Sequence, residues 1–396
     1  MNDKILQALI ELLRAEISQE SLRQETVELI KSIDLMALYR LSFQHDLAHL
    51  VADALEASDL LREEDPASEL FETQKMLAFF RYKQLSYEYG RICQALESEK
   101  IRFLPLKGSE IRPLYPEEWM RTSCDIDILI DPENVERAEK VLKKELKYHR
   151  SGQSLHDISL YSSNEDVHLE LHFSLIDDKE LPGVTEIVSR VWKYTSPAEH
   201  SEYQMKLSNE MLYFYHVAHL AKHVMHGGCG IRFFLDARII TDRLPLDTAV
   251  QDVLFRESEL LQFETCVRGL SDAWFGDAEM TEDLQTFQRF IVDNGSYGTA
   301  ETRLSINPVS RSSGRFRYFM YRAFPPKQTI LDGYPIVKKH PWLLLPFYVI
   351  RPFHRFFTSR GSSVFSEIKA QTKVSDQTKN SVDTLFGILG LPVDSK

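Results

Sequence analysis

Two aspartates that lie two positions apart are the residues of this sequence best suited to chemistry. Asp125 and Asp127 occur in residues 124–130, CDIDILI, whose apolar positions predict a β-strand. Side chains two apart on a strand point to the same face, so the two carboxylates would project together, roughly 6 to 7 Å apart at the backbone. Two carboxylates this close repel each other unless a cation lies between them, and hard divalent cations such as Mg²⁺ prefer oxygen ligands. The pair therefore predicts a metal site suited to phosphoryl or nucleotidyl transfer.

A bend and a second strand flank this pair in the sequence. Residues 101–106 form a short apolar run that predicts a strand, and Gly108 and Ser109 follow it where a helix would begin. Free N–H groups at the start of a helix can hold a phosphate. Further on, residues 167–173, VHLELHF, alternate so that His168, Glu170 and His172 share one face. Glu170 would reach the metal site from there, and His172 would orient it.

A plainer interpretation of the aspartate pair is the solvated face of an amphipathic strand, where polar residues alternate outward. Two features of the sequence favour a metal site instead. Asp125 and Asp127 are separated and followed by apolar residues, as in a strand that packs on one side and presents acids on the other. The Gly108-Ser109 turn upstream supplies the phosphate-binding group that a transfer site needs.

At these residues the chain resembles the nucleotidyltransferase superfamily. The fingerprint of that superfamily begins with an apolar residue, followed by Gly and then by Gly or Ser. Two acids around an apolar residue come next, and a third acid lies on a later strand. The corresponding positions here are Gly108, Ser109, Asp125, Asp127 and Glu170. The gap between Ser109 and Asp125 is longer than usual for the superfamily, which leaves the loop geometry and the nucleotide selectivity open.

The chain is more closely similar to a little-characterised bacterial branch of that superfamily. In this branch Leu-Lys-Gly opens the motif, an arginine precedes the acid pair, and an acid-Leu-His strand follows. Lys107, Arg121, Glu170 and His172 fit the pattern. The resemblance implies an α+β fold in which a small mixed β-sheet, the nucleotidyltransferase core with its helices, is embedded in a largely helical chain.

The resemblance also implies an enzyme, its ligands and its site residues. Asp125, Asp127 and Glu170 would be the catalytic, metal-binding acids and would hold two Mg²⁺ ions, with Mn²⁺ as the alternative ion. The nucleotide-binding residues would be Lys107, Gly108, Ser109 and Arg121. The donor would be an NTP, such as ATP, and the acceptor an unidentified hydroxyl of a small molecule, a sugar phosphate, a protein or an RNA end.

Four histidines recur with helical spacing farther along the chain, at positions 216, 219, 223 and 226. His219 and His223 imitate half of a zinc site, but the glutamate of an H-E-x-x-H motif is absent, so we do not expect a zinc enzyme. A glycine-rich turn and then Arg232 and Asp236 follow, a succession that recurs in the resembled family. His219, His223, Arg232 and Asp236 have two possible roles. They join the histidine-bearing helix to the helix of Arg232 and Asp236 through hydrogen bonds and ion pairs, or they contact nucleotide or acceptor.

Composition limits the class of protein. With 396 residues and 43% hydrophobic content, the chain can form two or three units with sizeable cores. Its four cysteines lie far apart without a C-x-x-C pair, which favours a reducing cytoplasm over a disulfide framework. The first residues lack the pattern of a signal peptide, and no apolar run is long enough to span a membrane.

The hydrophobic and charge patterns predict four regions. Residues 1–100 form an N-terminal helical region, 101–195 the nucleotidyltransferase-like catalytic core, 196–300 a helical domain, and 301–396 a basic, aromatic and proline-rich C-terminal region. The net charge is −12, yet residues 303–360 hold eleven Lys or Arg against one acid, Asp332. This basic segment would either lie against the acidic remainder of the chain, which is the interpretation we favour, or contact phosphate-rich partners or a peripheral membrane surface.

Two other functions are compatible with the motifs. A nucleotide-sugar glycosyltransferase also uses an Asp-x-Asp metal motif, although there the pair typically ends an apolar strand, whereas residues 128–130 continue it here. Alternatively, the mixed region is a non-catalytic nucleotide-binding module within a scaffold. Use of an intact nucleotide sugar would identify the first, and NTP binding without release of pyrophosphate would identify the second.

Overall fold

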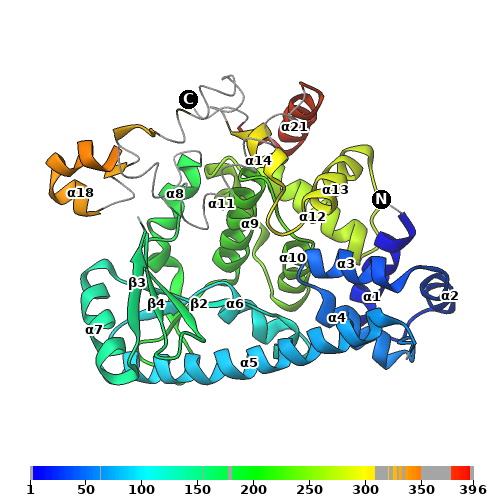
Figure 1. Cartoon of the computed structure of the whole chain (residues 1–396), viewed down its shortest axis with the longest axis horizontal. Helices are drawn as coiled ribbons and strands as arrows, with labels where there is room; N and C mark the ends of the chain where they lie inside the picture. Colours follow the sequence, from blue (N-terminus) through cyan, green and yellow to red (C-terminus); the bar gives the residue numbers. More distant parts are fainter. Residues whose placement is uncertain are drawn as a thin grey trace. The chain divides into compact units, whose positions relative to one another are not determined.

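The computed structural model describes most of the chain as two compact units. It describes residues 3–62, 64–154, 156–176, 181–307, 320, 324–327, 330–331, 335–348 and 376–392. The first unit comprises Met1–Leu220 and Gly230–Val292, and the second Ala221–Cys229 and Asp293–Lys396. Figure 1 labels most of their helices and some of the strands. The four regions expected from the sequence stay a prediction.

A five-stranded mixed sheet lies in the first unit, with the strand order β1-β2-β5-β4-β3. Its strands are β1 (Phe103–Pro105), β2 (Asp125–Ile130), β3 (His149–Gln153), β4 (Asp157–Tyr161) and β5 (His168–His172). β2 and β5 run parallel and the other neighbours run antiparallel, so β4 and β5 form a hairpin. A smaller antiparallel sheet pairs β6 (Thr195–Pro197) with β7 (Met205–Leu207). The predicted α+β class, with a small mixed sheet in a largely helical chain, is confirmed.

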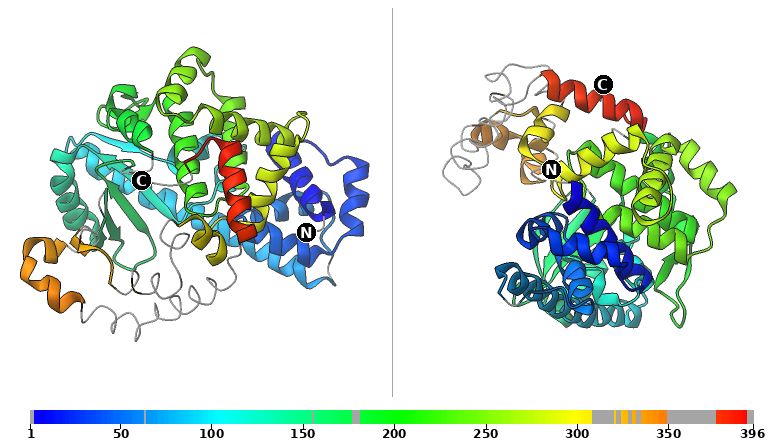
Figure 2. Two further views of the ribbon diagram at one scale, coloured as in Figure 1. Left: turned by 90° about the horizontal axis from the view of Figure 1, so that it is seen from above. Right: turned by 90° about the vertical axis from the view of Figure 1, so that its right-hand side faces the viewer.

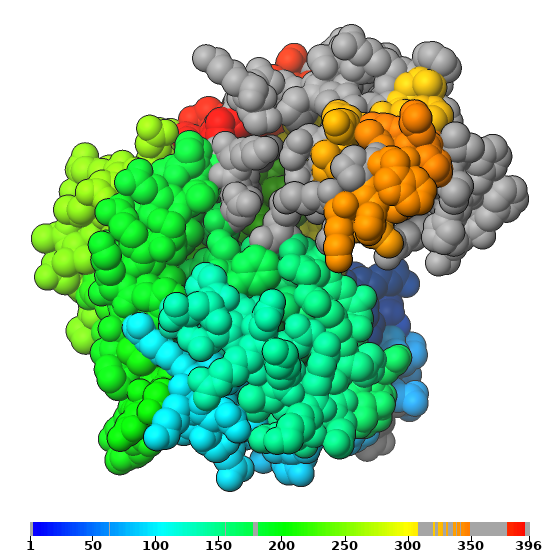
Figure 3. All heavy atoms as spheres, turned by 90° about the vertical axis from the view of Figure 1, so that its left-hand side faces the viewer, coloured from blue at the N-terminus to red at the C-terminus, as the bar shows by residue number. Residues whose placement is uncertain are grey.

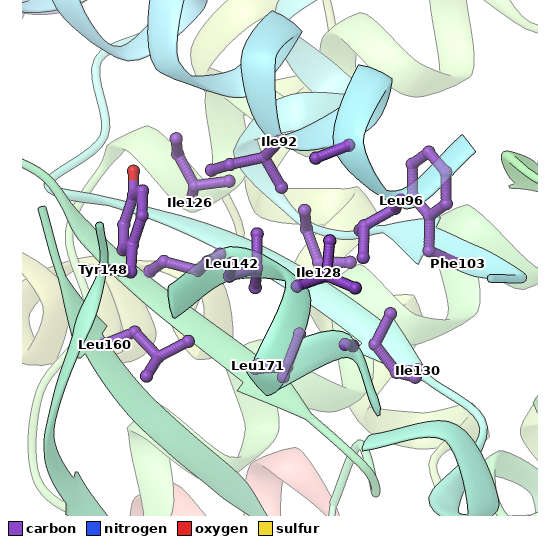
Figure 4. Close-up of a cluster of buried hydrophobic side chains, with 14 of the residues drawn as sticks. Ile92, Leu96, Phe103, Ile126, Ile128, Ile130, Leu142, Tyr148, Leu160 and Leu171 are labelled. Carbon is purple, nitrogen blue, oxygen red and sulfur yellow. The ribbon is translucent and has the colours of Figure 1, made fainter. Parts of the chain in front are cut away.

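One face of the five-stranded sheet is apolar and packs against α5 (Pro66–Ser98) and α7 (Val135–Leu146). Ile128 and Leu171 of the sheet share a buried cluster with Ile92 of α5 and Leu142 of α7, as Figure 4 shows. Figure 3 shows the surface on the side of the molecule where α7 lies in Figure 1. Because side chains alternate along a strand, burying this apolar face leaves the acids of β2 and β5 on the opposite face.

The helix α5 has 33 residues and a defined start. Asp65 caps it by accepting a hydrogen bond of 3.0 Å from the backbone N–H of Ala67, and Pro66 occupies the first turn. Four shorter helices pack at one end of α5 (Figures 1 and 2): α1 (Asp3–Ser18), α2 (Gln24–Ser32), α3 (Leu35–Gln44) and α4 (Ala48–Ala57). The helices expected before residue 100 are therefore present, and the long one spans the sheet and this helical group.

Shorter helices complete the first unit. They are α6 (Gly108–Ile111), α8 (Pro182–Val188), α10 (Arg232–Arg243), α11 (Thr248–Glu257) and α12 (Leu261–Phe275), with 3-10 turns η1 (Arg112–Leu114), η2 (Glu118–Met120), η3 (Pro132–Asn134) and η4 (Val191–Tyr194). The helices α9 (Asn209–Met225) and α13 (Glu282–Asn294) begin in the first unit and end in residues of the second. The loop that carries α6, η1 and η2 connects β1 to β2, so it leads directly into the aspartate pair.

The second unit contains α14 (Ala300–Ile306), α18 (Pro335–Lys339), η5 (Pro341–Leu343) and α21 (Asp376–Leu389), and α14 packs against α21. Much of the basic segment, including Arg315, Arg317, Arg322, Arg351 and Arg355, lies outside the described residues. Both interpretations of that segment therefore stay predictions. Within the described ranges, no helix combines the length and the apolarity that a membrane span requires.

Candidate metal and nucleotide site

The polar face of the sheet brings the three predicted carboxylates together. In the parallel pairing of β2 with β5, Asp125 lies opposite His168, and Asp127 lies opposite Glu170. The ligand atoms of Asp127, Glu170 and His172 lie within 4.8 Å of one another, and so do those of Asp125, His168 and Glu170. Glu170 belongs to both groups. Carboxylate oxygens and imidazole nitrogens at this spacing form a donor set that fits divalent cations.

Asp127 is the buried centre of the site, with an exposed fraction of 4%. Its Oδ1 atom lies 2.7 Å from Lys107 Nζ and 2.8 Å from His172 Nε2. Burial by itself would raise the pKa of this carboxyl, but the positive charge of Lys107 and the hydrogen bond from His172 outweigh burial and hold the pKa below its usual range. Asp127 is therefore ionised at neutral pH, as a metal ligand must be.

His172 bridges two of the acids. Besides Asp127, its Nε2 atom lies 3.3 Å from Glu170 Oε2, and the side chain is almost fully buried. Burial would lower the pKa of this imidazole, yet the hydrogen bonds to Asp127 and Glu170 raise it overall. This arrangement has the form expected of a residue that orients Glu170.

Asp125 has a different environment from Asp127. It is half-buried, and among the described residues it forms no ion pair. Burial and then the negative charge of Asp127 raise the pKa of this carboxyl above its usual value, while Lys107 acts in the opposite direction. Bringing a cation close to Asp125 would relieve this repulsion.

The bend before α6 places Lys107 against the acids. Lys107 has φ of 49° and ψ of −114°, a backbone conformation that favours glycine, and this conformation aims its ammonium group at Asp127. Burial opposes the charged form, but Asp127 raises the pKa of Lys107 above its usual value. The backbone N–H of Ser109 donates to the carbonyl of Leu106 at 3.1 Å. A phosphate contact by Ser109 would therefore come from its hydroxyl rather than its amide.

Arg121, expected to bind nucleotide, forms a buried ion pair with Asp236 of α10. Arg121 Nη2 lies 3.0 Å from Asp236 Oδ2, and the Tyr115 hydroxyl donates to Asp236 Oδ1 at 2.8 Å. Burial would raise the pKa of Asp236, but the charge of Arg121 lowers it overall. No local pattern in the sequence predicts the contact of Arg121 with Asp236, because it joins residues 115 positions apart.

The position of Arg121 explains why the motif has a glycine at position 108. A Cβ atom added at Gly108 would lie 3.0 Å from Arg121 Nη1 and 3.4 Å from Ser123 Cβ. Such a contact is tighter than nearly all real Cβ contacts, and Arg121 is held in place by Asp236. Gly108 therefore allows the bend to approach the segment that enters β2.

Comparison with known proteins agrees with this geometry. A family model described as "uncharacterised nucleotidyltransferase" matches residues 31–276, which is more than half of the chain. The chain belongs to this nucleotidyltransferase family. No curated protein and no solved structure matches the chain significantly. The matched range contains both carboxylate groups and Asp236, so the resemblance inferred from the motifs is confirmed at the level of the family.

Arg232 lies at the start of α10, and it also contacts the segment before β2. Its Nη1 atom lies 3.3 Å from Thr122 Oγ1, and its Nη2 atom lies 3.9 Å from Asp46 Oδ2. The first turns of α10 thus hold residues 121–122 through Arg232 and Asp236. The geometry favours the structural interpretation of these two residues, and a direct contact with nucleotide or acceptor stays a prediction.

The histidine-bearing helix α9 contributes aromatic packing. The His219 ring centroid lies 5.9 Å from that of Phe233 and 6.2 Å from that of Tyr215, and both His219 and His223 are half-buried. Among the described residues, neither histidine belongs to a group that could hold a metal ion. The role of both as acceptor contacts stays a prediction.

Tyr215 and His168 are residues of the site that sequence analysis did not assign a role. Burial raises the pKa of Tyr215 to about 12, with Lys107 opposing and Asp127 and Glu170 adding to the shift. The charges of Lys107, Asp127 and Glu170 thus all act on the phenol of Tyr215. His168 could have been assigned from the alternation that identified Glu170, whereas no local pattern marks Tyr215.

A cleft of about 990 Å³ opens next to His168, and Asp125, Asp127 and Glu170 are not among its lining residues. His168, Ser123 and Cys124 line it at the edge of the sheet, and exposed Leu77 and Phe80 of α5 line its apolar side. The remaining lining residues are Phe43, Asp46, Ala48, His49, Gln74, Ala78, Arg81, Gln84, Thr122, Tyr161, Glu165, Asp166 and Arg232. Its size is typical of small-molecule sites, so it can hold a substrate next to the Asp125 group.

Proposed function

We propose that the protein moves an NMP group from an NTP to an acceptor hydroxyl and releases pyrophosphate, using divalent metal ions. The observation that carries this proposal is the position of Glu170, which pairs in register with Asp127 and belongs to both acidic groups. Three carboxylates from two strands thus meet beside the Gly108-Ser109 bend. Membership of a nucleotidyltransferase family supports the same reaction.

The carboxylates of Asp125, Asp127 and Glu170 would hold two Mg²⁺ ions, or Mn²⁺ ions in their place. When bound, the ions neutralise charge that develops on the phosphates and lower the barrier to nucleophilic attack. Lys107 and His172 contact the same oxygen of Asp127 and so fix the orientation of this carboxylate. A carboxylate that is already oriented loses little entropy on binding a cation.

The bend and the basic residues would bind the nucleotide. The backbone of Gly108 and the hydroxyl of Ser109 would donate hydrogen bonds to the triphosphate, and Lys107 and Arg121 would balance its charge. The acceptor oxygen would then attack the α phosphorus, the bond from that phosphorus to the pyrophosphate oxygen would break, and Glu170 would accept the proton of the hydroxyl. The cleft that His168 lines is the approach that we assign to the acceptor.

The setting of the reaction is also a proposal. Four cysteines far apart in the sequence are typical of a protein from a reducing compartment, so we propose a cytoplasmic enzyme. Acceptors with a free hydroxyl in that compartment include small metabolites, sugar phosphates, proteins and RNA ends. Contact of the basic segment with a membrane surface stays a prediction.

The test is pyrophosphate release from NTPs in the presence of Mg²⁺ and fractionated cell extract, followed by analysis of the labelled product. Asp127→Asn should lower the rate at least about 100-fold, because the metal-bound transition state loses a charged ligand. Asp131→Asn is the matched control, since Asp131 follows β2 but belongs to neither acidic group. Equal rates for Asp127→Asn and the wild type would refute the assignment. NTP binding without pyrophosphate release would indicate a nucleotide-binding scaffold, and use of an intact nucleotide sugar would indicate a glycosyltransferase.

A further inference from the structure

His168 is an imidazole at the edge of the acidic site that the proposed function does not use. It is the first residue of β5, and it pairs in register with Asp125 across the parallel strands. The ligand atoms of Asp125, His168 and Glu170 all lie within 4.8 Å of one another. All three side chains are half-buried, so the group is partly open to solvent.

The ring of His168 is held in one orientation by residues of β4. Its Nε2 atom lies 3.2 Å from Ser159 Oγ, and its ring stacks on Tyr161 at 4.7 Å between centroids. Because the hydroxyl of Ser159 occupies Nε2, Nδ1 is the nitrogen left for a ligand. Histidines that bind metals usually donate their second ring nitrogen to such a partner, which sets the tautomer and the direction of the ring.

The charges around the two aspartates differ in a way that points to a cation near Asp125. Lys107 and His172 both contact Asp127, which therefore has two positive or hydrogen-bonding partners on one oxygen. Asp125 forms no ion pair within the described part of the chain and lies next to the charge of Asp127. A cation beside Asp125, His168 and Glu170 would balance this excess of negative charge.

We propose that Asp125, His168 and Glu170 form one cation site in which the His168 imidazole is a ligand, and that this ligand makes the site prefer Mn²⁺ over Mg²⁺. The inference rests on the proposed function, since it names the third ligand of one of the two expected ions. Mg²⁺ binds oxygen almost exclusively and keeps its waters, whereas first-row transition ions accept imidazole nitrogen alongside carboxylate oxygen. His168 also lines the 990 Å³ cleft, so the ion at this site faces the space assigned to the acceptor.

The test measures metal binding to the full chain rather than turnover. Calorimetric titration with MnCl₂ and with MgCl₂ gives the two dissociation constants, and pulsed EPR of the Mn²⁺ complex detects coupling to a directly bound imidazole nitrogen. In His168→Ala the Mn²⁺ dissociation constant should rise at least about tenfold and the Mg²⁺ constant less than about twofold, because only Mn²⁺ gains from the nitrogen ligand. The nitrogen coupling should weaken or disappear.

Two further variants separate ligation from folding and from orientation. His149→Ala, on the exposed strand β3, is the matched control and should bind both ions like the wild type. Ser159→Ala keeps the imidazole but removes its orienting hydroxyl, so the Mn²⁺ dissociation constant should rise about tenfold with the nitrogen coupling retained.

Several results would overturn the inference. Unchanged Mn²⁺ affinity and nitrogen coupling in His168→Ala would show that the imidazole is not a ligand. Equal weakening of Mn²⁺ and Mg²⁺ would show that His168 positions the carboxylates without selecting the ion. Absence of Mn²⁺ binding to the wild type, with or without a non-hydrolysable NTP analogue, would also overturn it. If NTP turnover with Mg²⁺ persists in these cases, the proposed function still holds. The proposed function is tested separately, by the turnover of Asp127→Asn.

Discussion

Lys107 Nζ lies 2.7 Å from Asp127 Oδ1, so the bend expected to bind phosphate is paired directly with a carboxylate expected to bind metal. The two residues are 20 positions apart and belong to the loop after β1 and to β2. Lys107 has a φ of 49°, a conformation that L-residues avoid. The site therefore combines a strained backbone with an ion pair. Substitutions of Lys107 can separate the effect of the strain on stability from the effect of the ammonium group on turnover.

The first prediction concerns this backbone strain. Lys107→Gly and Lys107→Ala both remove the ammonium group, but only glycine tolerates the positive φ. We expect Lys107→Ala to be less stable than Lys107→Gly by about 1 kcal/mol, as measured by urea unfolding. Both variants should lose NTP turnover to a similar extent, because both lack the charge beside Asp127. Equal stabilities of the two variants would contradict the strain.

The second prediction concerns the close approach at Gly108. In Gly108→Ala the new methyl group meets Arg121 Nη1, and Asp236 prevents the arginine from moving away. We expect the KM for NTP to rise about tenfold, because a displaced bend loses on the order of one hydrogen bond to the triphosphate. Gly90→Ala is the control, since nothing lies within 4 Å of a Cβ at this helical position. That variant should keep its KM and gain about 0.5 kcal/mol of stability.

The third prediction concerns the buried ion pair of Arg121 and Asp236. Asp236→Ala leaves the guanidinium buried without a counterion and removes the acceptor of the Tyr115 hydroxyl. The free energy of unfolding should fall by about 3 to 5 kcal/mol, measured by chemical denaturation.

A double variant distinguishes stability from function at this pair. Arg121→Met with Asp236→Leu replaces both charges by apolar groups of similar size, so most of the lost stability should return. NTP turnover should stay low, because the charge expected to balance the triphosphate is still missing. Full turnover in the stable double variant would show that Arg121 acts only through packing.

The fourth prediction concerns Glu16 of α1, which is buried. Burial, then the hydrogen bond and negative charge of Asp53, raise the pKa of Glu16 from 4.5 to about 8, against the opposing charge of Lys75. The folded chain thus holds a proton that the unfolded chain releases above pH 4.5. Stability from this group is complete below pH 4.5 and is lost as the pH rises toward 8.

Glu16→Gln should abolish that dependence, because glutamine has no proton to lose. At pH 8 the variant should be more stable than the wild type by on the order of 3 kcal/mol, and at pH 4.5 the two should agree. Urea unfolding at pH 4.5, 6, 7 and 8 measures the difference. Glu20→Gln, an exposed position nearby, is the control. Parallel pH profiles for Glu16→Gln and the wild type would contradict the assigned pKa.

Much of the site could be predicted from local patterns. The alternation in residues 167–173 placed His168, Glu170 and His172 on one face, and the structure confirms that face. The Asp-x-Asp spacing predicted two carboxylates on one side of β2, as observed. Such predictions succeed because the direction of a side chain on a strand depends only on its position in the strand.

Other features had no local signal. The short, polar strand β3 and the strands β6 and β7 were not anticipated, since three to five residues without apolar alternation are not distinctive in sequence. The 3-10 turn η3 precedes α7, which starts at Val135. The conformation of these segments depends on the segments that they pack against, which are distant along the chain.

The sequence alone determined the types of residue and the faces that they share: three acids, a glycine bend and an apolar sheet face belonging to a nucleotidyltransferase family. Only the tertiary structure decided which polar residues meet. It paired Lys107 with Asp127, Arg121 with Asp236, and Asp125 with His168. The reason is physical, because periodicity acts over a few residues, whereas these contacts depend on strand register and on packing between segments distant along the chain.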